Sequence, residues 1–225
     1  MSVFGKAMFD QLRQPNRNVT FHMRVVGGYG MDCPCQDFIR LRSEEESLIG
    51  QSLDGRQRPR ILDIGCGIGR HSAFIQSKRP DAQIMVVEID QELREHTRSN
   101  IARATAYERF SDVPAEVRFD IILLMGNGLG VFGSENATRD ALARVRGMVA
   151  EGGCVLIESG TFKPGEFHAV LHEIEYNGVI DDPFIWGYAT REWLARELEN
   201  VGFTGVSITQ SSRGGSFFII YAKII

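Results

Sequence analysis

The sequence contains no apolar run of the roughly 18–20 residues that a membrane-spanning helix needs. Its first sixteen residues, MSVFGKAMFDQLRQPN, lack the long apolar core of a secretory signal. The 25 Lys and Arg are outnumbered by 29 Asp and Glu, and the formal net charge of −4 provides no overall positive field for a nucleic acid. These absences predict a cytoplasmic protein whose partners are neither a membrane nor a nucleic acid.

Cysteines are few: Cys33, Cys35, Cys66 and Cys154. The pair Cys33-Pro34-Cys35 has C-x-C spacing, and the second pair that would complete a zinc site is missing. We therefore expect reduced, structural thiols and no metal site.

The sequence alternates strand and helix patterns from residue 60 onward, which predicts an α/β fold with a largely parallel sheet. Strands are expected at 60–64, 83–88, 119–125, 154–159, 206–209 and 217–224, and helices at 69–79, after Asp90, at 137–150 and at 190–203. Residues 1–58 lack this rhythm and are interpreted as an N-terminal cap of the same domain, while 59–225 form its main part. A helix is expected around 36–50, with the acidic run at 43–46 facing solvent.

The stretch RILDIGCGIGRHS, residues 60–72, places a glycine-rich turn between a strand and a helix. A dinucleotide fingerprint would need glycine at position 70, which is Arg70, and a phosphate-binding P-loop would need a G-K-[ST] ending. The loop therefore favours an adenosyl ligand without a pyrophosphate. Glu88 lies 23 positions after Gly65, at a strand end where a carboxylate can accept hydrogen bonds from ribose hydroxyls. Asp90 is the alternative, but its place before QELREHTRSN makes it the better helix N-cap.

The motif DIGCGIGRH at 63–71, the strand end VVEID, the strand FDIILL and the final helix with two antiparallel strands resemble class I S-adenosylmethionine-dependent methyltransferases, in particular those that act on small molecules. The resemblance implies a Rossmann-like seven-stranded, mostly parallel sheet, with helices on both faces and an antiparallel last strand. It also implies methyl transfer from S-adenosylmethionine to an oxygen or nitrogen nucleophile of a small molecule by in-line displacement.

The resemblance also implies which residues bind the cofactor. Ten residues are expected at the cofactor. Its methionine part is bordered by Asp63, Gly65, Cys66, Gly67 and Gly69, and its ribose is bound by Glu88. Its adenine packs against Ile89 and Phe110, and its sulfonium lies beside Met125 and Asn127. The chain departs from the family near the adenine, because Arg109 stands where an acidic residue is often found. Either Asp112 replaces that acid through a shifted loop or the backbone alone contacts the adenine.

The acceptor side is less well defined. Methyl transfer from a sulfonium depends mainly on alignment, and a general base is needed only if the nucleophile must lose a proton early. No histidine is assigned a catalytic role. His168 and His172 would share a face of a helix, although their segment also has an extended pattern. Tyr29 and Trp186 are the expected substrate-binding residues, with a purely structural role open for Trp186.

Other functions are compatible with parts of the pattern. The Asp/Asn-Pro-Pro-aromatic motif of many nucleic-acid amine methyltransferases is absent, since Gly126-Asn127-Gly128 occupies that position. Methylation of a protein and a non-catalytic cofactor-binding role remain alternatives. The sequence indicates neither the acceptor's identity nor the oligomeric state.

Overall fold

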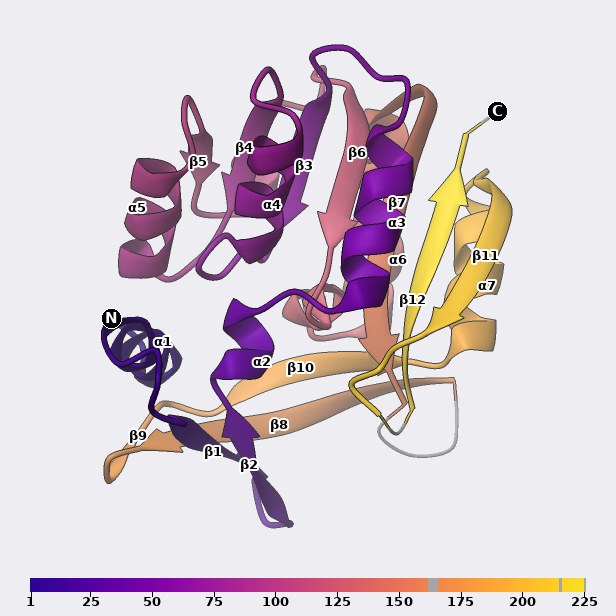
Figure 1. Ribbon diagram of the computed structural model, residues 1–225. Helices are drawn as coiled ribbons and strands as arrows, with labels where there is room; N and C mark the ends of the chain where they lie inside the picture. The colour runs from indigo at the N-terminus through magenta and orange to yellow at the C-terminus, as the bar shows by residue number, and fades with distance from the viewer. Residues whose placement is uncertain (162–165, 215, 225) are drawn as a thin grey trace.

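A seven-stranded, mostly parallel sheet forms the centre of the computed structural model, which describes residues 1–161, 166–214 and 216–224 (Figure 1). The strand order is β11-β12-β7-β6-β3-β4-β5. The bounds are β3 (Arg60–Ile64), β4 (Gln83–Val87), β5 (Thr105–Tyr107), β6 (Phe119–Leu124), β7 (Val149–Gly160), β11 (Thr204–Gln210) and β12 (Phe217–Lys223). The last strand, β12, runs antiparallel to both of its neighbours. The predicted fold class is thereby confirmed.

The central strands are apolar on both faces, because helices cover both faces of the sheet. In β6, Ile121 and Leu123 pack on one side with Ile75 of α4, and Ile122 and Leu124 pack on the other with Leu142 of α6. The flanking helices are α3 (Ser43–Leu53), α4 (Arg70–Lys78), α5 (Gln91–Asn100), α6 (Glu135–Met148) and α7 (Arg191–Asn200). Among the described residues, no helix is long and apolar enough to cross a membrane.

Three helix ends follow from local chemistry, and the cap at Asp90 was expected. Asp90 caps α5 by accepting a hydrogen bond from the Leu93 backbone N–H (3.1 Å), and Thr190 caps α7 through Trp193 (3.2 Å). Gly202 ends α7 with a φ of +92°, a backbone conformation that favours glycine.

Two predicted boundaries are wrong. The helix expected around 36–50 is two helices, α2 (Gln36–Ile39) and α3, separated by extended residues. The separation arises because the Arg70 guanidinium donates to the carbonyls of Asp37 and Arg40, which a continuous helix would need for itself. The second error concerns residues 149–153. The helix was expected to end at 150 and the next strand to begin at 154, but β7 already begins at Val149. Gly152 lies at a register shift in the pairing of β7 with β6.

A second, antiparallel sheet lies beyond the carboxyl ends of the parallel strands, and α1 (Val3–Arg13) and α2 lie between the two sheets (Figure 1). The order is β10-β8-β1-β2, and β9 pairs with β8. Its strands are β1 (Thr20–Val25), β2 (Gly30–Pro34), β8 (Phe167–Tyr176), β9 (Val179–Ile180) and β10 (Phe184–Ala189). Met23 of β1 is the cross-strand partner of Ile174 of β8, so the N-terminal segment shares a sheet with the chain that follows β7. This pairing was not predicted.

Candidate active site

The glycine-rich loop connects β3 to α4 through three left-handed residues: φ is +71° at Gly65, +56° at Gly67 and +78° at Gly69. Two of these glycines have different surroundings. A Cβ atom on Gly69 would lie 2.5 Å from the Thr97 Cγ2 atom, so the loop packs closely on α5 there. A Cβ on Gly67 would meet no heavy atom within 4 Å. The backbone at Gly67 is therefore open to a ligand.

Glu88 lies across from this loop, directly after β4. Its two carboxylate oxygens accept hydrogen bonds from the backbone N–H groups of Gly67 (2.9 Å) and Asp90 (3.0 Å). Burial raises the pKa of Glu88, although these two backbone hydrogen bonds act in the opposite direction. The carboxylate is thus fixed beside the open part of the glycine loop. Each oxygen still has a second lone pair for a ligand hydroxyl.

Asp90 is already engaged in structural contacts. Besides capping α5, it accepts a hydrogen bond from the Ser2 backbone N–H (2.7 Å), which fixes the start of α1. Burial alone would raise the pKa of Asp90, but the Ser2 hydrogen bonds outweigh this effect and lower it. The helix-cap interpretation of Asp90 is confirmed.

Asp63 and Cys66 of the loop region are buried rather than open. Asp63 is 1% exposed, accepts a hydrogen bond from the Ser72 hydroxyl (2.7 Å), and burial raises its pKa. Burial also raises the pKa of the Cys66 thiol. These two side chains pack on the buried side of the loop. Among the residues predicted for this loop, the backbone near Gly67 is the part that a ligand can reach.

The turn after β6 brings two further left-handed residues to the same edge of the sheet. Gly126 has a φ of +67° and Asn127 a φ of +61°. Asn127 is 4% exposed, and its Nδ2 is 3.5 Å from the carbonyl oxygen of Gly187 in β10. Its Oδ1 accepts no hydrogen bond from the described residues. A buried amide oxygen without a donor is costly, which indicates a place for a ligand donor. Met125, beside it, is buried.

The two residues expected at the adenine differ in exposure. Ile89 is 75% exposed. Phe110 lies half-buried at the start of a short 3-10 helix (Phe110–Asp112), with the Arg144 guanidinium 5.1 Å from its ring. Asp112 accepts a hydrogen bond from the Arg109 backbone N–H (3.1 Å), which is a contact within its own turn.

Trp186 and Tyr29, the expected acceptor residues, come from different parts of the second sheet: Trp186 from β10 and Tyr29 from the connection between β1 and β2. The Trp186 indole covers Gly130, where a Cβ would lie 1.9 Å from the indole nitrogen, and it packs edge-on against Phe184 at 5.8 Å. Tyr29 lies in the turn between β1 and β2 and is 66% exposed. The structure thus places Trp186 against the turn after β6 and leaves Tyr29 at the surface.

A buried histidine–tyrosine pair was not predicted. The Tyr188 hydroxyl is 3.0 Å from the His172 Nε2 atom, between β10 and β8. Burial lowers the pKa of His172, and a hydrogen bond with the Arg24 backbone partly opposes this. Burial raises the pKa of Tyr188 to about 12. At neutral pH the pair is therefore an uncharged imidazole beside a protonated phenol. His168 and His172 lie on a strand, and no group of three metal-ligating side chains occurs in the described ranges.

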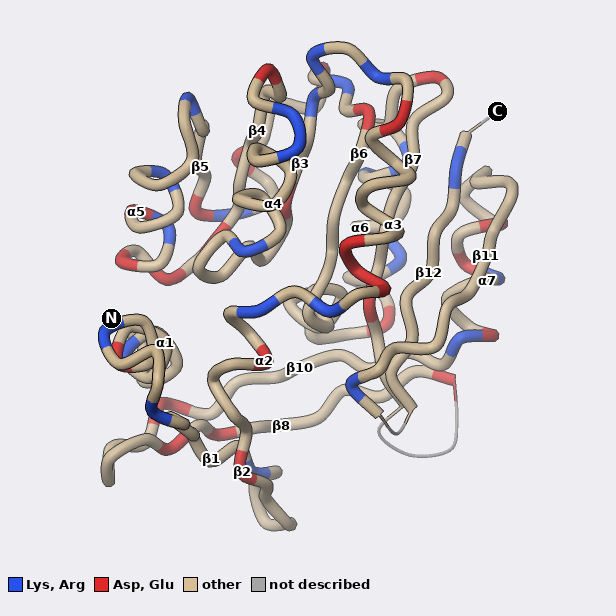
Figure 2. Tube along the Cα trace, viewed as in Figure 1, with Lys and Arg blue, Asp and Glu red and all other residues tan. Residues whose placement is uncertain are grey.

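Within the acidic run at 43–46, Ser43 and Glu46 are exposed as expected, but Glu45 is part of a buried ionic cluster. Glu45 has no exposed side-chain surface and contacts Arg42 (2.8 Å), Arg70 (2.9 Å) and His71 (3.1 Å). Figure 2 shows the basic residues of the α2–α3 linker next to the acidic start of α3. Burial raises the pKa of Glu45, but the hydrogen bond and charge of His71, with Arg70, outweigh it and lower the pKa to about 2. Such pairing of distant residues leaves no signal in the local sequence pattern.

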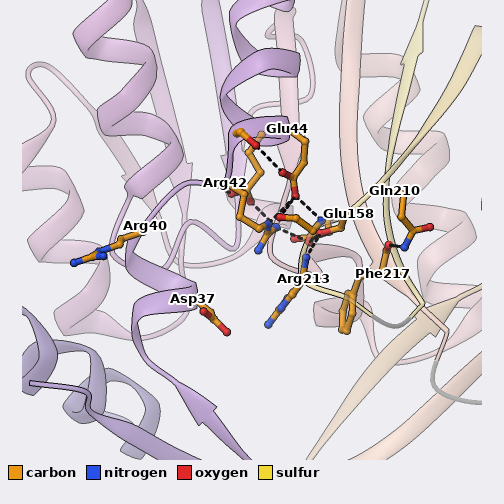
Figure 3. Close-up of polar contacts among 12 residues, drawn as sticks. Asp37, Arg40, Arg42, Glu44, Glu158, Gln210, Arg213 and Phe217 are labelled. Atoms are coloured by element: carbon orange, nitrogen blue, oxygen red, sulfur yellow. Dashed lines mark hydrogen bonds and ion pairs between the residues drawn. The ribbon is translucent and has the colours of Figure 1, made fainter.

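The buried ionic cluster also includes Glu158, which lies next to Ser159 at the carboxyl end of β7. Both are fully buried. Ser159 accepts a hydrogen bond from the Ala189 backbone N–H (3.2 Å), and Glu158 pairs with Arg42 (2.5 Å), as Figure 3 shows. These side chains point inward because they connect the carboxyl end of β7 to Arg42 and to the backbone of Ala189.

Comparison with known proteins agrees with this geometry. Residues 61–153 match a family model described as a methyltransferase domain. Residues 61–153, which include the glycine loop, Glu88 and the turn after β6, are thus similar to a methyltransferase domain. None of the curated protein sequences is similar enough to this one to count as a match.

Solved structures share the fold at low sequence identity. A methyltransferase from Bacteroides fragilis in complex with S-adenosyl-L-homocysteine is 16% identical, with a TM-score of 0.78 over 98% of this chain and 94% of that one. CalS10, an amino pentose methyltransferase from Micromonospora echinaspora with bound S-adenosylmethionine, is 15% identical (TM-score 0.61, 80% and 90% covered). A Burkholderia thailandensis 1,6-didemethyltoxoflavin-N1-methyltransferase is 19% identical (TM-score 0.60, 81% and 77% covered). The similarity to the first extends through nearly the whole methyltransferase chain, including the second sheet.

Proposed function

We propose that this protein transfers a methyl group from S-adenosylmethionine to an oxygen or nitrogen nucleophile of a small molecule. The observation that carries the proposal is the arrangement at the carboxyl edge of the parallel sheet. There an open left-handed Gly67 faces the Glu88 carboxylate, and the buried Oδ1 of Asn127 lacks a donor. Four solved structures with this fold hold the donor, its demethylated product or, in a glycopeptide N-methyltransferase, sinefungin.

The residues present fit such a cofactor. Glu88 would accept hydrogen bonds from the ribose hydroxyls, with Ile89 and Phe110 near the adenine. The glycine loop from Gly65 to Gly69, supported by Asp63 and Cys66, would border the methionine part. Met125 and Asn127 would lie beside the sulfonium. When bound, the cofactor supplies a methyl group that is already activated by its positive sulfur.

The protein's own task is then to orient the two reactants, which can supply several kcal/mol of rate acceleration. Trp186 and Tyr188 lie on either side of Gly187, whose carbonyl contacts Asn127. The second sheet, with Trp186 and Tyr29, would thus hold the acceptor near the sulfonium. If the acceptor is a hydroxyl, its proton can pass to Tyr188 as the phenolic proton passes to neutral His172. The acceptors named for CalS10 and for the toxoflavin enzyme are small molecules, which supports an acceptor of this class.

Calorimetric titration with S-adenosylmethionine and S-adenosylhomocysteine tests the proposal. We expect both to bind the wild-type protein, and neither to bind Gly67→Arg, whose side chain would fill the open side of the loop. Binding would be followed by an acceptor screen with labelled methyl donor. A folded wild-type protein that binds neither ligand would refute the proposed cofactor.

A further inference from the structure

Glu158 joins three segments that are distant in the sequence. Its Oε2 accepts a hydrogen bond from the Gly126 backbone N–H (2.7 Å), in the turn after β6. Its Oε1 accepts from the Arg42 guanidinium (2.5 Å), in the linker before α3, and from the Ser211 hydroxyl (3.2 Å), after β11. One buried carboxylate therefore fixes both the turn beside the proposed sulfonium position and the N-terminal segment.

Arg42 extends this connection to the glycine loop. Its Nη2 atom is shared between Glu158 and Glu45. Glu45 in turn binds Arg70 and His71 in the first turn of α4. That turn begins directly after Gly69. The chain of contacts thus runs from the turn after β6, through the linker before α3, to the end of the glycine loop.

The turn that Glu158 holds needs support. Gly126 and Asn127 are consecutive left-handed residues. Glycine and asparagine both tolerate this conformation but are not confined to it, so the turn depends on contacts to stay in one geometry. The Gly126 N–H donates to Glu158, and the Asn127 side chain contacts β10. Removing the first contact would free the turn to take up more relaxed conformations.

Stability alone does not account for the cluster. Burying charges is expensive, and apolar residues of similar volume can replace a buried ion pair without loss of stability. What such a pair provides is a defined geometry, because each buried charge must stay within reach of its partner. In this chain the geometry that it fixes is that of the turn with the unsatisfied Asn127 oxygen.

We infer that Arg42 and Glu158 are positioning residues, which hold the Gly126–Asn127 turn in the conformation that contacts the methionine end of the cofactor. This inference rests on the proposed function, since it assumes that S-adenosylmethionine binds at the glycine loop. Neither residue contacts the reacting atoms. Their effect on binding is confined to the methionine end, because the adenosine end is contacted by Glu88 and by residues outside the cluster.

The test compares two ligands in the full-length chain by calorimetry. S-adenosylhomocysteine has the methionine-derived amino-acid chain on its sulfur, and 5′-methylthioadenosine has a methyl group there instead. The main variant is Glu158→Gln, which keeps the side-chain volume but replaces one carboxylate oxygen by an NH2 group. Either the Gly126 N–H or the Arg42 guanidinium then faces a donor in place of an acceptor. We expect a loss of S-adenosylhomocysteine affinity of about tenfold or more, as for a lost hydrogen bond to a charged group. Affinity for 5′-methylthioadenosine should stay within about twofold of wild type, since no contact at that end changes.

Matched variants complete the experiment. Glu173→Gln makes the same chemical change in the Arg24–Glu173 ion pair (2.7 Å) of the second sheet, and it should leave both affinities unchanged. Arg42→Gln should reproduce the selective loss, and Arg42→Lys should restore part of it by returning a positive charge to Glu158. If Arg42→Gln fails to fold, the isosteric Glu158→Gln and the charge-conserving Arg42→Lys still give the comparison.

The outcomes separate the two proposals. Wild-type protein that binds neither ligand would refute the proposed cofactor. If the wild type binds both and Glu158→Gln binds them equally well, or loses both in parallel, the positioning role is wrong while the cofactor stands.

Discussion

Glu88 and Asp90 lie two residues apart after β4, and replacing each by its amide should separate ligand binding from helix capping. Both changes keep the side-chain volume and remove one negative charge. Glu88 accepts from Gly67 and Asp90 and faces the open part of the glycine loop, whereas Asp90 accepts from Leu93 and Ser2. The two substitutions are therefore matched in chemistry and differ in position.

The expected magnitudes follow from these contacts. Glu88→Gln would lose about one charge-assisted hydrogen bond to the ribose, worth about 2 kcal/mol, which corresponds to roughly 30-fold weaker binding of S-adenosylhomocysteine. Asn is as good an N-cap as Asp, so Asp90→Asn should keep the Leu93 contact. It should lose the hydrogen bond from Ser2, and the unfolding free energy should fall by about 1 kcal/mol with unchanged affinity.

Calorimetry and urea denaturation of both variants would measure these effects. Burial raises the pKa of Glu88, so the wild-type affinity should also fall as the pH is lowered and this carboxylate is protonated. This pH dependence should be weaker in Glu88→Gln. Equal losses of affinity in the two variants would contradict the assignment of Glu88 to the ribose. An unchanged affinity in Glu88→Gln would show that no ligand hydroxyl contacts this carboxylate.

Three further predictions concern other contacts. Gly69→Ala should lower the unfolding free energy by about 2 kcal/mol or more in urea denaturation, because its Cβ would clash with Thr97 and its φ of +78° disfavours any side chain; full stability would contradict the close packing. The folded state lowers the pKa of Glu45 from 4.5 to about 2, which corresponds to about 3 kcal/mol of stability. This contribution should be present above pH 4.5 and lost as the pH falls toward 2. The variant Glu45→Gln should lack this acid-sensitive part of the stability. Tyr188→Phe should lower the unfolding free energy by about 1–3 kcal/mol, because it removes the phenol that contacts the His172 Nε2 atom. ¹⁵N NMR of the wild type should find a neutral His172 at pH 7. An imidazolium signal would exclude this histidine as a proton acceptor.

Much of the parallel sheet was predictable because its determinants are local. The apolar run at 119–124 is long enough to be buried on both faces, and Asp90 and Thr190 cap their helices through residues three positions away. The left-handed loop requires glycine wherever it forms, so its spacing is visible in the sequence. Position 88 follows from the same logic, since a parallel strand brings its last residue to the same edge as the loop.

The second sheet and the charge cluster were decided by tertiary structure. Met23 pairs with Ile174 across about 150 positions, and no local pattern specifies which strand lies opposite another. Glu45 looks like part of a solvated helix face, because three acidic residues in a row have no apolar periodicity. It is buried because Arg42, Arg70 and His71 surround it, and these partners come together only after the chain has folded.

The sequence by itself therefore determined where a nucleotide-like ligand is expected: strand, glycine turn and acidic strand end are all encoded within thirty residues. Tertiary structure decided which side chains at that edge remain open and which are turned inward. Asp63 and Glu158 both stand at strand ends, yet each is buried by a partner from another segment, Ser72 for one and Arg42 for the other. The physical reason is that a carboxylate's exposure depends on whether a donor from elsewhere in the chain reaches it, and that is a property of the fold.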